Sequence, residues 1–403
     1  MKTSNTTQQS DSISNTEFIV LMAMIMSLMA LAIDAMLPAL DAIGASLNVL
    51  NPNDNQLIIS SVFFGMCAGL MLYGPMADAV GRKKAIYLGI GIFLLGDLIS
   101  WFADDFNLMI LGRLLQGFGA AACRVVSITM IRDKFTGKEM ARTMSLIMMT
   151  FIMVPALAPL FGQLILLFAN WQAIFFLLFI FAFCSLLWLH FRLDETLAPE
   201  NQIPFSINNL KSGIVETLKH PVSLPYTLAA GIMFGSFVGY LSSAQQILQL
   251  QYQTDELFAL YFAVLALSLG SASFANSKLV MIFPIEKLCK LALSTLSVLG
   301  TLFFIYALSY QGEPPLWAFM IYLIMTFFCF GILFGSFNTL AVQPLGHIAG
   351  VANSTISTLS TFISVLIGFS IGQFYDGTIL PLVFGFAACG FCSLIITYRV
   401  PQA

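Results

Sequence analysis

The chain consists of long apolar runs separated by short polar segments. Each run has about 20 residues, the length that an α-helix needs to cross the hydrocarbon core of a bilayer. Of the 403 residues, 59% are hydrophobic and only 9% are charged, whereas soluble domains carry roughly 25% charged residues. Because a soluble core cannot bury this much apolar surface, the sequence predicts an all-α polytopic membrane protein.

We expect twelve transmembrane helices, one for each apolar run. The approximate boundaries are 18–43, 56–77, 85–103, 108–131, 140–168, 172–191, 223–247, 256–277, 288–310, 316–341, 350–373 and 379–398. The residues before the first run are rich in Ser, Thr, Asn and Gln, and such polar segments stay disordered. We therefore expect residues 1–17 to form a disordered cytoplasmic tail, and the first helix to be retained rather than removed as a signal peptide.

The positive charges fall on one side of this arrangement. If the N-terminus is cytoplasmic, every Lys and Arg except Arg113 and Arg124 lies in the tail, in a cytoplasmic segment or at the C-terminus. Short loops rich in Lys and Arg stay in the cytoplasm. A missed or extra helix would invert every later loop and destroy this pattern, so the sequence predicts that both termini are cytoplasmic.

The longest connection, 192–222, divides the chain into two halves. It contains Pro199, Pro204 and Pro221 together with charges of both signs, and we interpret it as a cytoplasmic linker. Residues 211–219 are expected to form a short surface helix within it. The sequence thus predicts two six-helix bundles, 18–191 and 223–403, the parallel-repeat plan found in some secondary transporters.

A charged turn joins the second and third runs. Gly74, Pro75 and Gly81 are expected to break the helix there, and the basic residues 82–84 are expected to hold the turn on the cytoplasmic side.

Four charged residues lie inside apolar runs: Asp34, Asp97, Arg113 and Arg124. Charge in hydrocarbon is costly, so each is a candidate functional residue. Counted at ~1.5 Å per residue, Asp34 and Arg113 both fall in the outer half of the membrane and could face each other. They would then form either a structural ion pair or a proton-exchanging carboxylate whose pKa the arginine sets.

Arg124 shares a helical stripe with Arg113, because residues 113, 117, 120 and 124 are spaced by three or four positions. It either contacts a substrate in a central cavity, or pairs with Asp97 or extends toward the inner surface. When Asp34 is protonated, a cavity wall with Arg124 is net positive, so we expect neutral dipolar or anionic substrates. The polar residues assigned with Arg124 to the substrate cavity are Gln116, Gln245, Gln246 and Asn338.

The fifth run contains Pro155 and Pro159, followed by Gly162, which predicts a bent helix. The three histidines have no metal-site spacing, and no nucleophile elbow or Walker loop is present. We therefore expect no enzymatic activity, no metal, no cofactor and no nucleic-acid partner.

Several of these motifs resemble those of the major facilitator superfamily. Its signature loop, Gly-x-x-x-Asp-x-x-Gly-Arg-Lys, is matched by Gly74, Asp78, Gly81, Arg82 and Lys83. Further matches resemble the drug:proton antiporter branch and its Bcr/CflA group. They are Asp34 before Leu37-Pro38, Arg113-x-x-Gln116-Gly117 with Arg132-Asp133, Ala158-Pro159-x-x-Gly162, and Asp194-Glu195-Thr196-Leu197.

The resemblance implies a function and a role for each motif. Asp34 would be the site of protonation and substrate competition, and Arg113 would tune its pKa. Asp78 and Arg82 would form a charge latch between helices. Pro155, Pro159 and Gly162 would be the antiporter helix element.

The protein would be a monomer in the bacterial plasma (inner) membrane that exports drugs or other small amphiphilic compounds in exchange for protons. The alternatives are an exporter of a specific metabolite such as a siderophore, a facilitated uptake carrier, and a non-transporting scaffold.

Overall fold

The structure is a computed structural model that describes residues 13–204, 206–254 and 257–400. Within these ranges it is helical and contains no strand. The helices before the linker are α1 (Asn15–Asp34), α2 (Leu40–Ser46), α3 (Leu57–Val80), α4 (Arg82–Trp101), α5 (Phe106–Lys134), α6 (Gly137–Leu166) and α7 (Gln172–Arg192). The later helices are α8 (Ile207–Lys219), α9 (Ser223–Gln245), α10 (Phe258–Leu279), α11 (Ile285–Ser309), α12 (Leu316–Val342), α13 (Ala349–Gln373) and α14 (Leu380–Tyr398). Short turns of helix connect some of them: η1 (Leu37–Ala39), η2 (Pro52–Gln56), η3 (Pro199–Asn201), the π-helical η4 (Gln246–Gln251) and η6 (Gln343–Ile348).

The membrane-spanning character of the chain is confirmed. In the described residues, ten helical stretches are long and apolar enough to cross a membrane. One of these stretches, 316–373, is 58 residues long and contains both α12 and α13, and in α6 the apolar part is the shorter Met153–Leu166.

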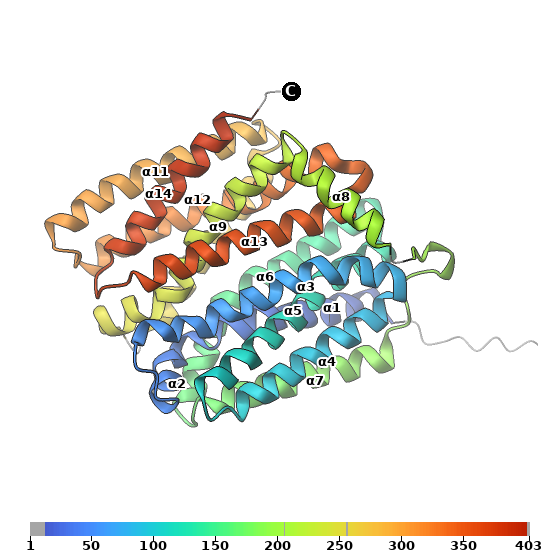
Figure 1. Cartoon of the computed structure of the whole chain (residues 1–403), viewed down its shortest axis with the longest axis horizontal. Coiled ribbons are helices and arrows are strands. Elements are labelled where there is room, and N and C mark those ends of the chain that lie inside the picture. The colour runs from blue at the N-terminus through green and yellow to red at the C-terminus, as the bar shows by residue number, and fades with distance from the viewer. Residues whose placement is uncertain (1–12, 205, 255–256, 401–403) are drawn as a thin grey trace, which may run out of the picture.

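The helices pack in two groups, one before and one after the 192–222 segment. In the first group α5 packs against α3 and α4, and α1 packs against α5, α6 and α7; in the second, α9 packs against α13 and α14, and α12 against α10 and α11. The groups meet where α3 packs on α13 and α6 on α10. Figure 1 shows the long helices side by side, with the first group in the lower part and the second in the upper part.

The first helix begins earlier than predicted. Ser14 caps α1 by accepting a hydrogen bond from the backbone N–H of Glu17, at 3.2 Å. The Glu17 carboxylate then binds the guanidinium of Arg192 through two bonds of 2.7 and 2.8 Å. The predicted disordered tail is therefore wrong for residues 15–17, which are helical, and residues 1–12 lie outside the described part of the chain.

The predicted first span, 18–43, is not one continuous helix. The helix α1 ends at Asp34, and the chain continues through η1 into the short α2. Pro38 explains the break, because it has no N–H to donate to the carbonyl of Asp34 and its ring would clash with that carbonyl in a continuous helix. Asp34 consequently lies at a helix end rather than within a helix.

The charged turn is tighter than the sequence predicted. Gly74 and Pro75 do not break α3, which continues through both of them to Val80; prolines are tolerated within transmembrane helices when neighbouring helices support the backbone. The single break is Gly81, whose φ of 102° and ψ of 151° are accessible at low cost only to glycine.

The linker contains the helix predicted for residues 211–219, which extends over the whole of α8. It lies near the cytoplasmic ends predicted for its neighbours and packs on α13. Gly213 makes this packing close, since a Cβ there would lie 2.7 Å from Cγ1 of Val351. In Figure 1, α8 and α2 lie at opposite ends of the bundle.

Candidate functional site

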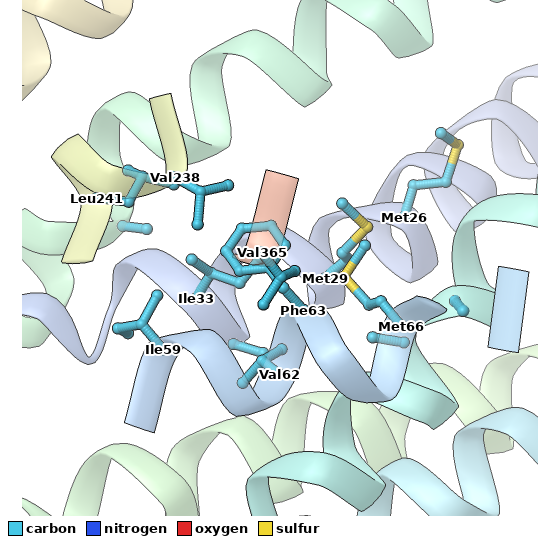
Figure 2. Close-up of a cluster of buried hydrophobic side chains, with 14 of the residues drawn as sticks. Met26, Met29, Ile33, Ile59, Val62, Phe63, Met66, Val238, Leu241 and Val365 are labelled. Atoms are coloured by element: carbon cyan, nitrogen blue, oxygen red, sulfur yellow. The ribbon is translucent and has the colours of Figure 1, made fainter. Parts of the chain in front are cut away.

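A cavity of about 320 Å³ lies between the two groups of helices. Its walls come from α1, α3, α5 and α6 on one side and from α9, α10, α12 and α13 on the other. Most of the lining is apolar, and seven phenylalanines contribute to it: Phe63, Phe234, Phe237, Phe262, Phe327, Phe334 and Phe337. Figure 2 shows the neighbouring core, where Met29, Ile33 and Phe63 from α1 and α3 lie close to Leu241 and Val238 from α9.

Asp34 and Arg124 are the charged residues that line this cavity in the described part of the chain. Asp34 stands at the end of α1 and is only 6% exposed, whereas Arg124, on α5, is partly exposed. No hydrogen bond or ion pair joins either side chain to another described residue. The cavity therefore presents one carboxyl group and one guanidinium, and neither forms an ion pair with a neighbouring described side chain.

The cavity is closed at the end that lies away from the N-terminus. There the amide of Gln56 donates to Oε1 of Gln246 at 2.6 Å, and the amide of Gln246 donates to Oδ1 of Asn53 at 3.0 Å. Asn53 and Gln373 each donate from the side chain to the backbone carbonyl of the other, at 3.2 and 3.1 Å. We call these four residues the closed gate, since they join η2 of the first group to η4 and α13 of the second.

The opposite end of the cavity is open. Asn338 lines the cavity and is exposed, as is Asn353, to which it donates a hydrogen bond of 3.3 Å. Among the described residues, every hydrogen bond between 13–191 and 223–400 lies at the closed end. The cavity thus opens toward the face that carries the N-terminus.

Two of the predicted cavity residues belong elsewhere. Gln246 is a member of the closed gate, and Gln245 is 4% exposed and does not line the cavity. Both lie at the end of α9, where the chain turns into η4 and the two groups of helices touch. Asn338 and Arg124, by contrast, do line the cavity as predicted.

Arg113 lies in a buried polar network rather than in the cavity. Its guanidinium donates to the carbonyls of Ile58, at 3.0 Å, and Ala32, at 2.7 Å, and also to the amide oxygen of Gln116. The amide nitrogen of Gln116 in turn donates to Asp97 Oδ1 at 2.8 Å. Arg113, Gln116 and Asp97 are all 0% exposed.

This network corrects three expectations. Arg113 does not face Asp34, Gln116 does not line the cavity, and Asp97 is linked to Arg113 rather than to Arg124. The stripe that Arg113 and Arg124 share on α5 predicts that both face the cavity. This prediction holds for Arg124 but not for Arg113. At the level of Arg113, carbonyls of α1 and α3 take up the guanidinium, whereas the Arg124 side chain, about three turns further along α5, reaches the cavity.

The proline-containing segment of α6 packs against the break after α1. A Cβ at Gly162 would lie 2.0 Å from the carbonyl oxygen of Ala35, so only glycine permits this approach. Pro155 lines the cavity and Pro159 is buried. The predicted antiporter element thus touches the chain immediately after Asp34.

The signature loop forms an ion cluster. Arg82 binds Asp78 and, through Nε, the Oδ2 of Asp133 at 2.9 Å. The carboxylate of Glu195 accepts hydrogen bonds from the backbone N–H groups of Arg82 and Lys83, at 2.9 and 3.0 Å, and so caps the positive end of α4. Gly74 has ordinary space around it, with Val125 at 3.9 Å from a built Cβ.

Sequence reasoning missed several of these residues as site residues. Asp133 and Glu195 belong to family motifs in the sequence, but nothing in the sequence connects either residue to Arg82. Asn53, Gln56 and Gln373 lie in or beside short polar connections. Such connections have no periodic pattern, so no signal identified them as a gate.

We expect the double substitution Asn53→Ala and Gln246→Ala to open the closed gate. It removes hydrogen bonds between the two groups, each of which contributes about 0.5–1.5 kcal/mol, and about 1.4 kcal/mol changes a population ratio tenfold. In a Ser360→Cys background, where the cysteine lines the cavity, labelling by an impermeant thiol reagent added on the side of the closed gate should rise roughly tenfold.

The matched control is Gln251→Ala, because Gln251 donates to Gly312 within the second group. It should leave labelling unchanged. Equal labelling in the double variant and in the parent would show that these bonds do not hold the gate closed.

Comparison with known proteins identifies the family. A model of the Major Facilitator Superfamily matches residues 19–369. The chain is 30% identical over 320 residues to the uncharacterized MFS-type transporter YdgK of Bacillus subtilis, with 79% of each chain covered. It is 26% identical over 353 residues to the bicyclomycin resistance protein homolog of Haemophilus influenzae, with 87% of each covered. It is also 26% identical over 371 residues to the multidrug resistance protein MdtL of Escherichia coli, covering 86% of this chain and 87% of the relative.

Solved structures share the fold. The xylose transporter XylE from E. coli, in a partially occluded inward-open conformation, aligns with a TM-score of 0.74 at 14% identity, over 96% of this chain and 98% of XylE. The human organic anion transporter MFSD10 (TETRAN) aligns with a TM-score of 0.70 at 15% identity, over 95% and 99% of the two chains. The protein is therefore a membrane transporter of the major facilitator superfamily, with relatives in the drug:proton antiporter branch that its motifs resemble.

Proposed function

We propose that this transporter exports small amphiphilic compounds from the bacterial cytoplasm in exchange for protons. The observation that carries the proposal is Asp34, a carboxyl group without a partner in the cavity between the two groups of helices. The relatives named for bicyclomycin and multidrug resistance support export as the direction. The protein would act as a monomer in the inner membrane.

The proposed topology has twelve spans in two six-helix bundles, 18–191 and 223–403, joined by the linker 192–222. At ~1.5 Å per residue a straight helix of 58 residues would be ~87 Å long, which is far more than one crossing of a ~30 Å core. The stretch 316–373 is therefore counted as two spans, α12 and α13, and α6 as one. With the N-terminus cytoplasmic, the open end of the cavity faces the cytoplasm and the closed gate faces outward.

In this scheme Asp34 holds either a proton or a substrate. Ionised Asp34 favours a substrate that donates a hydrogen bond or carries positive charge, and protonation removes that attraction. Because Asp34 ends α1 and Gly162 of α6 packs immediately beyond it, a change at Asp34 acts directly on the contact between these helices. Arg113 would hold the last turn of α1 through the carbonyl of Ala32.

The ion cluster of Asp78, Arg82 and Asp133 lies far from the cavity, at the cytoplasmic end of the first bundle. We propose that it acts on the balance between the inward- and outward-open states rather than on substrate affinity. The Glu195 cap would keep the linker attached to the same end of the bundle.

A drug-susceptibility panel in an efflux-deficient bacterial host tests the proposal. Cells that express the protein should survive higher concentrations of at least one compound, and a protonophore should abolish the protection. Accumulation of the compound instead of its exclusion would indicate an uptake carrier. Protection that persists without a proton gradient would exclude proton coupling. If the protein transports none of the drugs or metabolites tested, a non-transporting scaffold is favoured.

A further inference from the structure

The two unpartnered charges of the cavity lie at different depths. The guanidinium of Arg113 reaches the carbonyl of Ala32 at 2.7 Å, which fixes the level of α5 relative to α1. Arg124 follows eleven residues later on α5, ~16 Å nearer the open end of the cavity at ~1.5 Å per residue. Asp34 lies beyond Ala32, toward the closed gate. The acid and the base are therefore well separated along the bundle.

The wall between these charges is apolar and faces them from the second bundle. On α12 the lining runs from Phe327 to Asn338, a distance of ~16 Å along a helix. Phenylalanines from α9, α10 and α12 cover this length. The cavity is thus elongated, with a carboxyl group near one end, an aromatic middle, and the guanidinium of Arg124 with the Asn338 amide near the other.

We propose that the preferred substrate is an elongated dipolar amphiphile, with a hydrogen-bond-donating or ammonium group bound to Asp34 and a carboxylate or carbonyl group bound to Arg124. Its aromatic or aliphatic body packs against the phenylalanine wall. The inference rests on the proposed function and specifies the chemical class of its substrate. A buried charge gains most from a partner that satisfies it, and such a molecule satisfies both charges together.

This substrate class fits exchange for protons. Protonation of Asp34 removes the negative charge that holds the donating end of the substrate. The other charged or titratable groups near Asp34 are Arg113, whose guanidinium is held by carbonyls and Gln116, and the phenol of Tyr240 on α9. A purely anionic substrate would bind better when Asp34 is protonated. Substrate and proton would then cross the membrane together in the same direction, as in a symporter, rather than in exchange.

The test uses three probes with the same p-terphenyl body, whose three rings bring the length of the probe close to the separation of the two charges. One carries an aminomethyl group at one end and a carboxylate at the other, the second carries only the aminomethyl group, and the third only the carboxylate. Binding to the purified full-length protein is measured for each. We expect the dipolar probe to bind about tenfold more tightly than either singly charged probe, since only the dipolar probe can form a charge-assisted hydrogen bond at both ends of the cavity.

Substitution of Arg124 separates the two ends of the probe. In Arg124→Gln the dipolar probe should bind no better than the aminomethyl probe, whose own affinity should not fall. Arg124→Lys should keep the preference, and it decides the question if Arg124→Gln does not fold. The matched control is Arg132→Gln, an exposed arginine at the end of the same helix, which should behave as the wild type.

Equal binding of the three probes by the wild type, or no binding of any of them, overturns the inference. So does an unchanged preference for the dipolar probe in Arg124→Gln. These results leave the proposed function standing if the susceptibility panel shows proton-dependent export. The absence of export in that panel overturns the proposed function itself, whatever the probes show.

Discussion

Cells that produce the Asp34→Asn variant should lose resistance completely, to the level of cells that carry no transporter. Asparagine has almost the same size as aspartate but cannot release a proton, so the exchange of proton for substrate has no carrier. Asp34 is the acid that lines the cavity in the described residues, whereas Asp97 is enclosed in the Arg113 network. The measurement is the minimum inhibitory concentration of each compound to which the wild type confers resistance.

Asp41→Asn is the matched control, since Asp41 lies seven residues later on α2 and is exposed. It should leave resistance unchanged. Both variants must reach the membrane in wild-type amounts, which immunoblots of membrane fractions establish. Normal resistance in Asp34→Asn cells would remove Asp34 from the coupling mechanism.

The second large effect is on stability and concerns the buried network of the first bundle. Arg113→Gln leaves the carboxylate of Asp97, which Gln116 links to Arg113, buried without a cation nearby. Breaking a directly bonded buried charge pair costs about 3–5 kcal/mol, which is the upper limit for this indirect pair. The structure shows no second partner for it, because Asp97 Oδ2 is buried and makes no hydrogen bond among the described residues. Thermal unfolding of the detergent-solubilised variant should therefore occur well below that of the wild type.

The double variant Arg113→Gln with Asp97→Asn should recover a large part of this loss. The neutral amide introduced at position 97 can still bond with the side chain of Gln116, and no uncompensated charge remains. The effects of the two substitutions should therefore not be additive. Arg132→Gln again serves as the control for loss of a positive charge from α5. Additive destabilisation in the double variant would show that the link through Gln116 does not couple Asp97 to Arg113.

The helical, membrane-spanning character of the chain could be predicted from the sequence, because the length of an apolar run that crosses a bilayer depends on the bilayer alone. The orientation predicted from the placement of Lys and Arg stays a prediction. The cost of burying a charge in hydrocarbon likewise marked Asp34 and Arg124 as candidate functional residues. Both do line the cavity. The family resemblance identified the signature loop and the α6 element before any geometry was known.

The partners of individual residues could not be predicted in this way. A helical stripe gives the direction of a side chain but not the groups that it meets there. Carbonyls of α1 and α3 bind Arg113 in a closed network, whereas Arg124 reaches the cavity. The end of α1 at Asp34 depends on Pro38, whereas Pro75 leaves α3 intact. Propensity alone does not distinguish these two prolines, because the outcome depends on the surrounding helices.

The most direct test of the central claim is proton release upon substrate binding. A compound identified by the susceptibility panel is added to purified protein in weakly buffered detergent solution, and the pH is recorded over a series of starting values. Since coupling between two bound species is reciprocal, a substrate that competes with the proton on Asp34 must expel it. The account predicts up to one proton released per bound molecule by the wild type and none by Asp34→Asn. Absence of release from the wild type, or equal release from Asp34→Asn, would contradict it.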